Sequence, residues 1–176
     1  MNKLEGYLKQ FVIQFSGLKN GFHEYQVEVV DLFFEQFNIE DVTGGNFQVD
    51  FSLEKRDTMM ELNFKFNGTL KTSCDRCLDS MTLPMKGERE LLVKFGDVTS
   101  TENDELLVLG YEAYQIDVAP YIYEFISLNF PLRKVHEENE CNQEVIDRLY
   151  PEVENEQEDN ETSNMWDKLK ELKNKN

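Results

Sequence analysis

Apolar and polar side chains alternate over residues 10–16, so that the aromatic and aliphatic ones share one side. A period of two is typical of a strand with one buried face. The Asn20-Gly21 pair that follows is a common hairpin turn, and residues 22–29 are suited to a returning strand. The pattern therefore predicts that residues 10–16 and 22–29 form a β-hairpin.

The same alternation recurs over residues 46–55 and again over residues 60–68, with a short polar turn between them. These two stretches are predicted to form a long antiparallel hairpin with one buried face. The Gly44-Gly45 pair in front of them favours a loop.

Four further short strands are predicted after the central hairpin, over residues 81–83, 91–93, 105–109 and 112–116. The segment between the second and third of these, residues 96–104, is polar and is expected to be a loop.

Three helices are predicted within the first 150 residues. Residues 30–37 are too apolar, and alternate too little, for a surface strand, and they favour a short helix. Asp117 is a good N-cap for a second helix that carries Pro120 in its tolerant first turn and stops at Pro131. Residues 142–149 favour a third helix.

Together these elements predict an α+β fold, mainly an antiparallel sheet with a few short helices and an acidic C-terminal tail. We expect one domain over residues 1–150. The acidic, Asn-rich segment 151–164 is predicted to be a disordered linker. Residues 165–176 are predicted to form a short amphipathic helix, because Trp166, Leu169 and Leu172 share one stripe.

The net charge of −17 is unevenly distributed. Residues 137–161 carry eleven acidic side chains against one basic side chain, whereas residues 54–94 carry eight basic against seven acidic. Such a chain as a whole repels a phosphate backbone, which disfavours simple non-specific RNA binding. The charge distribution leaves two kinds of binding open: RNA binding through a local basic face, and binding to a basic protein.

The sequence begins without an apolar signal region and has no run of about 18 apolar residues, so we expect a soluble, cytoplasmic protein. It contains three cysteines, an odd number that argues against a disulfide framework.

Cys74 and Cys77 have two residues between them and follow a predicted strand. Two thiolates at this spacing on a tight turn can bind one zinc ion at about 2.3 Å, and a structural site needs two more ligands. His136 and Cys141 are the candidates, with four residues between them. The four side chains form a candidate structural zinc site that would tie the sheet to the C-terminal region.

Other interpretations of these residues stay open. A Cys-x-x-Cys pair can carry redox chemistry, although this one lies between strands and lacks a surrounding thioredoxin-like pattern. His136 and Cys141 can equally be an ordinary surface histidine and a buried cysteine.

Nothing in the sequence indicates an enzyme. His23 lies in an alternating strand as a pairing or surface residue, and no Ser-His-Asp set, phosphate-binding glycine loop or His-Glu-x-x-His motif is present. The aromatic residues at 47, 51, 64 and 66 could stack RNA bases, but their strand spacing next to other apolar residues favours a core position.

The chain resembles the YceD family of large ribosomal RNA subunit accumulation proteins. The motifs that carry the resemblance are residues 15–21, 74–78, 123–124 and 128–132, followed by His136, Cys141 and the ending at residues 166–172. The Cys-x-x-Cys-Leu sequence with a distant apolar-Pro segment leading to His and Cys is its most specific part. Some members carry additional cysteines in the second segment, which this chain lacks.

The resemblance implies a non-catalytic accessory of large ribosomal subunit assembly that promotes accumulation or processing of large-subunit ribosomal RNA. The expected partner is ribosomal RNA or a basic ribosomal protein of the large subunit, with no membrane and no small-molecule substrate. The alternative is a structural protein-interaction module unrelated to ribosomes. A catalytic zinc is the least favoured reading, because it needs an open coordination position and a nearby general base.

Overall fold

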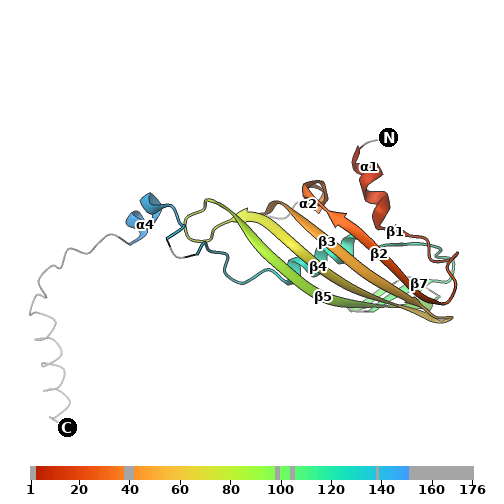
Figure 1. Ribbon diagram of the computed structural model, residues 1–176. Helices are drawn as coiled ribbons and strands as arrows, with labels where there is room; N and C mark the ends of the chain where they lie inside the picture. The colour runs from red at the N-terminus through yellow and green to blue at the C-terminus, as the bar shows by residue number, and fades with distance from the viewer. Residues whose placement is uncertain (1–2, 38–41, 98–99, 104–105, 138, 151–176) are drawn as a thin grey trace, which may run out of the picture.

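The computed structural model describes residues 3–37, 42–97, 100–103, 106–137 and 139–150. Within these residues the chain forms a six-stranded sheet, a two-stranded sheet and several short helices (Figure 1). The predicted α+β class with a mainly antiparallel sheet is confirmed. The predicted linker and C-terminal helix, residues 151–176, lie outside the described residues.

The large sheet has the strand order β2-β3-β4-β5-β7-β6. Its strands, in that order, are β2 (Gly21–Val29), β3 (Val42–Lys55), β4 (Met59–Ser73), β5 (Ser80–Gly96), β7 (Leu106–Gly110) and β6 (Ser100–Asn103). The strands β2 to β5 pair antiparallel with their neighbours in sequence. β7 then runs parallel to β5, and β6 pairs antiparallel with β7.

Alternation along the central strands separates a buried face from a polar one, as predicted. Phe51 on β3 pairs with Tyr25 on β2 and with Phe64 on β4, and its ring stacks on both at 5.1 and 5.0 Å between centroids. The intervening residues Gln48 and Asp50 point to the exposed face. Cross-strand aromatic pairs of this kind stabilise the register of the sheet.

The helix α3 (Ala119–Leu128) lies behind the sheet in Figure 1 and packs on its apolar face. The ring centroid of Phe125 is 5.4 Å from that of Phe64, and Ile122 and Ile126 are almost fully buried. The predicted helix is confirmed with Pro120 in its first turn, but its N-cap is Val118 and not Asp117. Asp117 lies one residue earlier, where its side chain accepts a hydrogen bond from the Ala119 N–H at 2.9 Å.

The N-terminal segment corrects one prediction. It forms α1 (Lys3–Leu8), the 3-10 turn η1 (Lys9–Phe11) and the two-residue strand β1 (Val12–Ile13). β1 pairs with β8 (Ile116–Asp117), so the predicted hairpin with residues 22–29 is wrong.

The N-terminal segment pairs with β8, outside the large sheet, although β2 is an edge strand whose only strand partner among the described residues is β3. This strand pairs with β3 along its whole length, starting at Gly21, so the Asn20-Gly21 pair opens a strand and does not reverse the chain onto β1. Lys55 holds the incoming loop, because its ammonium group donates to the carbonyl oxygens of Phe15 and Leu18 at 3.0 and 2.8 Å. The buried alternation was nevertheless predicted correctly, since Phe15 is only 3% exposed.

The predicted helix over residues 30–37 is confirmed as α2 (Asp31–Phe37), but the predicted loop at Gly44-Gly45 is wrong. Both glycines belong to β3, at a register irregularity where α2 docks. Gly44 has a φ of 152°, and the Asp31 carboxylate, which accepts from the Gly45 N–H at 2.9 Å, occupies the space a side chain on Gly44 would need. The glycines therefore mark a bulge and a close approach.

Two of the four short strands predicted after the central hairpin are parts of a single long strand. Residues 81–83 and 91–93 belong to the 17-residue strand β5, which pairs with β4 over residues 80–94. Residues 105–109 are confirmed in essence as β7, whereas only the end of 112–116 is a strand, as part of β8. The 96–104 segment, predicted as a loop, contains β6.

The last described element is α4 (Gln143–Leu149), which lies beyond the turn between β4 and β5, at the end of the sheet away from α1 (Figure 1). The Asn142 side chain caps it by accepting from the Glu144 N–H at 3.1 Å. None of the helices in the described residues has the length and hydrophobicity that a membrane-spanning helix requires.

Candidate metal centre

The first half of the site is the turn that joins β4 to β5. Cys74 follows the last residue of β4, and its N–H and C=O bond to the Asp79 carbonyl and the Leu78 N–H, each at 2.9 Å. Leu78 adopts a left-handed φ of 64°, which is uncommon for a residue with a side chain. The turn thereby brings Cys74 and Cys77 to the same side.

The second half comes from the segment between α3 and α4. Asp75 fastens this segment to the turn: its N–H donates to the Lys134 carbonyl at 2.7 Å, and its carboxylate accepts from the Lys134 N–H at 2.6 Å. The Lys134 ammonium lies 3.7 Å from the same carboxylate. His136 follows two residues later and therefore reaches the turn.

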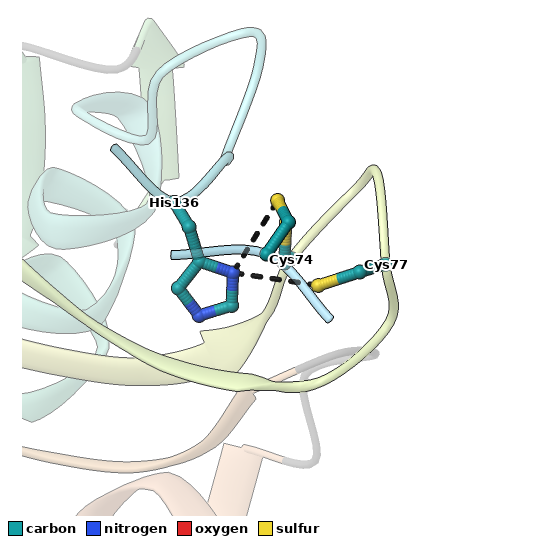
Figure 2. Close-up of side chains that lie close together, drawn as sticks. Cys74, Cys77 and His136 are labelled. Carbon is teal, nitrogen blue, oxygen red and sulfur yellow. Dashed lines mark hydrogen bonds between the residues drawn. The ribbon is translucent and has the colours of Figure 1, made fainter. Parts of the chain in front are cut away.

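The ligand atoms of Cys74, Cys77, His136 and Cys141 all lie within 4.8 Å of one another. The His136 Nδ1 is 3.4 Å from the Cys77 sulfur and 3.9 Å from the Cys141 sulfur, and the Cys74 and Cys141 sulfurs are 3.9 Å apart. Figure 2 shows the Cys77 side chain and the His136 ring facing each other across the turn.

The cluster is enclosed. Cys74, Cys77 and Cys141 are 0%, 3% and 9% exposed, and all three are free thiols. They form a small group separate from the main core, together with the partly buried Met81, Val135, Val145 and Ile146. Thiols gathered away from the main core, with few apolar neighbours, suit metal binding better than simple packing.

Hydrogen bonds stabilise the thiolate form of Cys74. Burial raises the pKa of its thiol, but the backbone N–H groups of Cys77, His136 and Arg76 and the Cys77 side chain lower it, with a net pKa of about 6. The Arg76 N–H lies 3.4 Å from the sulfur. Backbone donors aimed at a sulfur stabilise the negative charge that a metal ligand carries.

The pKa values of the other three groups are shifted as well. For Cys77, burial raises the pKa, but the N–H groups of Asn142 and Asp79 outweigh it and the net pKa is lowered. Burial lowers the pKa of His136, but hydrogen bonds and charges of Cys77 and Cys74 raise it overall. Burial, with the two neighbouring cysteines, raises the pKa of Cys141. One cation in this position can replace the protons that the cluster holds.

The structure thus brings together all four residues that the sequence nominated as ligands, although the widest spacing, 4.8 Å, exceeds the about 4 Å expected for ligands around one zinc ion. Sequence reasoning missed Asp75, the residue that joins the two segments. Its position between the two cysteines could have indicated this role, because aspartate side chains commonly accept hydrogen bonds from backbone N–H groups in turns.

The remaining candidates lie elsewhere. His23 is on β2, and one of its ring nitrogens lies 2.8 Å from the Lys19 carbonyl oxygen. The aromatic residues at 47, 51, 64 and 66 are at most 4% exposed, so they belong to the core, as their spacing indicated, and cannot offer a surface for base stacking.

Comparison with known proteins gives one match. The family model for the large ribosomal RNA subunit accumulation protein YceD matches residues 62–173. A search of the curated proteins and a search of the solved structures each give no significant match. The matched range contains the turn after β4, α3 and the second ligand segment, and therefore all four residues of the metal cluster.

Proposed function

The chain belongs to the YceD family of large ribosomal RNA subunit accumulation proteins, and from this premise we propose that it is a non-catalytic accessory of large-subunit assembly. In this role it promotes the accumulation or processing of large-subunit ribosomal RNA. The observation that carries the proposal is the family match, which extends over 112 residues from β4 into the C-terminal segment.

The metal cluster is proposed to be structural, with zinc held by the sulfurs of Cys74, Cys77 and Cys141 and the Nδ1 of His136. Three thiolates and one imidazole are a common structural zinc set, and ligand atoms around zinc lie about 3.7 Å apart. Three of the separations, 3.4 to 3.9 Å, agree with this spacing, whereas the widest, 4.8 Å, would have to shorten on metal binding. Zinc in this place would join the β4–β5 turn to the segment that leads into α4.

Four protein ligands also support a role without catalysis. A catalytic zinc keeps one position open for water or substrate, whereas three cysteines and a histidine complete a tetrahedron. The Asp75–Lys134 contacts fix the two ligand segments against each other, which is the arrangement expected of a structural site.

The proposed partner is ribosomal RNA or a basic ribosomal protein of the large subunit. The family name supports a ribosomal partner. The net charge of −17 favours a basic protein for the molecule as a whole, whereas RNA requires a locally positive surface.

The cellular test is deletion of the gene. We expect less mature large-subunit than small-subunit ribosomal RNA, with precursor particles visible in sucrose gradients, and a stronger defect in the cold, where misfolded intermediates are longer lived. Unchanged subunit ratios and particle profiles would remove the ribosomal role and leave an interaction module unrelated to ribosomes.

The metal is tested on the purified chain. We expect about one zinc ion per molecule, lost in the Cys74→Ser variant because a hydroxyl is a poor zinc ligand. His23→Gln is the matched control, since it changes the only other histidine of the chain, far from the cluster in sequence, and should retain zinc. Equal zinc content in both variants would contradict the assignment.

A further inference from the structure

A pocket of about 400 Å³ lies beside the metal cluster, between the β4–β5 turn and α4. Its lining residues come from the turn, from the segment after α3 and from α4: Arg76, Arg133, Asn139, Cys141, Gln143, Ile146 and Tyr150. It is a separate feature from the cluster, with which it shares only Cys141.

The lining carries two arginines and no carboxylate, in a chain with nearly twice as many acidic as basic side chains. Within the described part of the chain, neither Arg76 nor Arg133 has an ion pair or a side-chain hydrogen bond. Lys134, by contrast, is bound to Asp75. The two guanidinium groups are therefore free to bind an anion, and their planar donor geometry suits phosphate.

The other side chains of the pocket are suited to a nucleobase. Tyr150 is 66% exposed and offers a ring for stacking. Asn139 and Gln143 supply amide groups that can bond to base edges, and Ile146 contributes an apolar surface. Arginine for the phosphate and an aromatic ring for the base are the combination by which proteins bind single-stranded RNA.

We propose that this pocket binds one nucleotide of single-stranded RNA, with the phosphate between Arg76 and Arg133 and the base against Tyr150. The inference rests on the proposed function and deepens it, because it selects RNA over a basic ribosomal protein as the direct partner. It also reconciles RNA binding with the acidic chain: contact is confined to one positive pocket at the end of the sheet.

A competing role for the arginines is to balance the charge of the metal centre, since three thiolates and one zinc ion carry a net charge of −1. The two roles separate experimentally. Arginines that serve the metal affect zinc content when replaced, whereas arginines that bind RNA affect RNA affinity and leave zinc in place.

The test uses the full-length, zinc-loaded chain and a fluorescent single-stranded RNA of about 12 nucleotides, followed by anisotropy. We expect Arg76→Gln/Arg133→Gln to weaken binding by about tenfold or more and to make the salt dependence shallower by about 1.4, for two lost phosphate contacts. Tyr150→Ala should weaken binding at least about fivefold and leave the salt dependence unchanged, because stacking involves no counterion release.

Arg89→Gln is the matched control. Arg89 is an exposed arginine of β5 outside the pocket lining. Its replacement removes one positive charge, half the change made in the double variant, and should leave RNA affinity within about twofold of the wild type. Unchanged zinc content and thermal unfolding in all variants show that they are folded.

The proposal would be overturned by no RNA binding by the wild type, by equal weakening in Arg89→Gln, or by zinc loss in the double variant. Tighter binding of a glutamate-rich peptide than of RNA would also overturn it, in favour of an acidic protein partner. Failure of the pocket is distinguishable from failure of the proposed function. If the double variant restores large-subunit RNA in the deletion strain, the pocket is wrong and the function stands, whereas a deletion without any ribosomal defect removes the function itself.

Discussion

At the scale of single residues, the positions where a side chain would meet backbone are the most sensitive in the sheet. Gly68 on β4 pairs with Phe47 on β3, and a Cβ built on Gly68 would lie 2.6 Å from the Phe47 Cα and even closer to the Asn46 carbonyl oxygen. Neither backbone atom can move without disturbing the pairing of two central strands, which is why the strand carries glycine here.

We expect Gly68→Ala to destabilise the protein by about 2 kcal/mol or more, because overpacking against backbone forces the strands apart. Urea unfolding followed by circular dichroism measures this loss. Gly17→Ala is the control, since no atom lies within 4 Å of the added Cβ, and it should have little effect. Equal stability of the two variants would show that β3 and β4 adjust freely.

The Cys74 thiol gives a second prediction at this scale. Its pKa of about 6 favours the thiolate above that pH, and this preference is lost as the pH falls through it. Protons then compete with the metal, and bound zinc lowers the apparent pKa further, so zinc should stay bound at neutral pH and leave below about pH 6. A zinc-sensitive dye in a pH titration reports the release. Release on raising the pH would reverse the expected sign.

At the scale of elements, the molecule has two unequal parts. The main core joins the apolar face of the large sheet to α3 and the N-terminal segment, whereas α4 contains no fully buried residue. α4 contacts the rest through Val145 and Ile146, which pack on the metal cluster. We infer that α4 and the ligand segment depend on the metal, and that the sheet does not.

Removal of zinc by a chelator should therefore expose the backbone amides of residues 133–149 to hydrogen exchange and leave those of β3 and β4 protected. The reason is that local stability follows the local packing, and the cluster end has little apolar contact of its own. Exchange followed by mass spectrometry distinguishes the two regions. Uniform loss of protection over the whole chain would mean that the metal supports the entire fold.

The packing of α3 on the sheet gives an independent prediction. Phe125→Ala removes a side chain that is 3% exposed and contacts Phe64, so it should cost about 3 kcal/mol or more in unfolding free energy. Leu128→Ala on the same helix is the control, because Leu128 is 58% exposed and its loss leaves no cavity. Similar unfolding midpoints for the two variants would place α3 outside the cooperative core.

At the scale of the whole molecule, charge decides which partners approach. The eleven acidic side chains of residues 137–161 favour repulsion of a phosphate backbone, whereas the proposed contacts of Arg76 and Arg133 would attract one at close range. The balance between these effects depends on ionic strength, because salt screens the distant charges most.

Neutralising four of these acids, in Glu152→Gln/Glu154→Gln/Glu156→Gln/Glu158→Gln, should strengthen RNA binding about three- to tenfold in low salt and have little effect in high salt. Anisotropy at two ionic strengths measures the change. If the direct partner is instead a basic ribosomal protein, the same variant should bind that protein more weakly and fail to restore large-subunit RNA in the deletion strain.

Elements that depend on local patterns could be predicted from the amino-acid sequence. Alternating apolar residues identified the β3–β4 hairpin, and Asp117 followed by Pro120 located the start of α3 to within a residue, because these signals act between neighbours in sequence. The spacing of Cys74 and Cys77, with His136 and Cys141 downstream, nominated the cluster. The chemistry of those side chains is fixed by residue type and requires no coordinates.

Strand pairing and contacts between distant residues could not be predicted from local patterns and became evident from the three-dimensional fold. β1 joins β8 and not β2, and β7 joins β5 in parallel, because strands more than a turn apart are chosen by the shape of the shared core and not by their own sequences. The Asp75–Lys134 contacts and the Arg76–Arg133 pocket likewise unite segments 59 and 57 residues apart, and no local pattern encodes such a meeting.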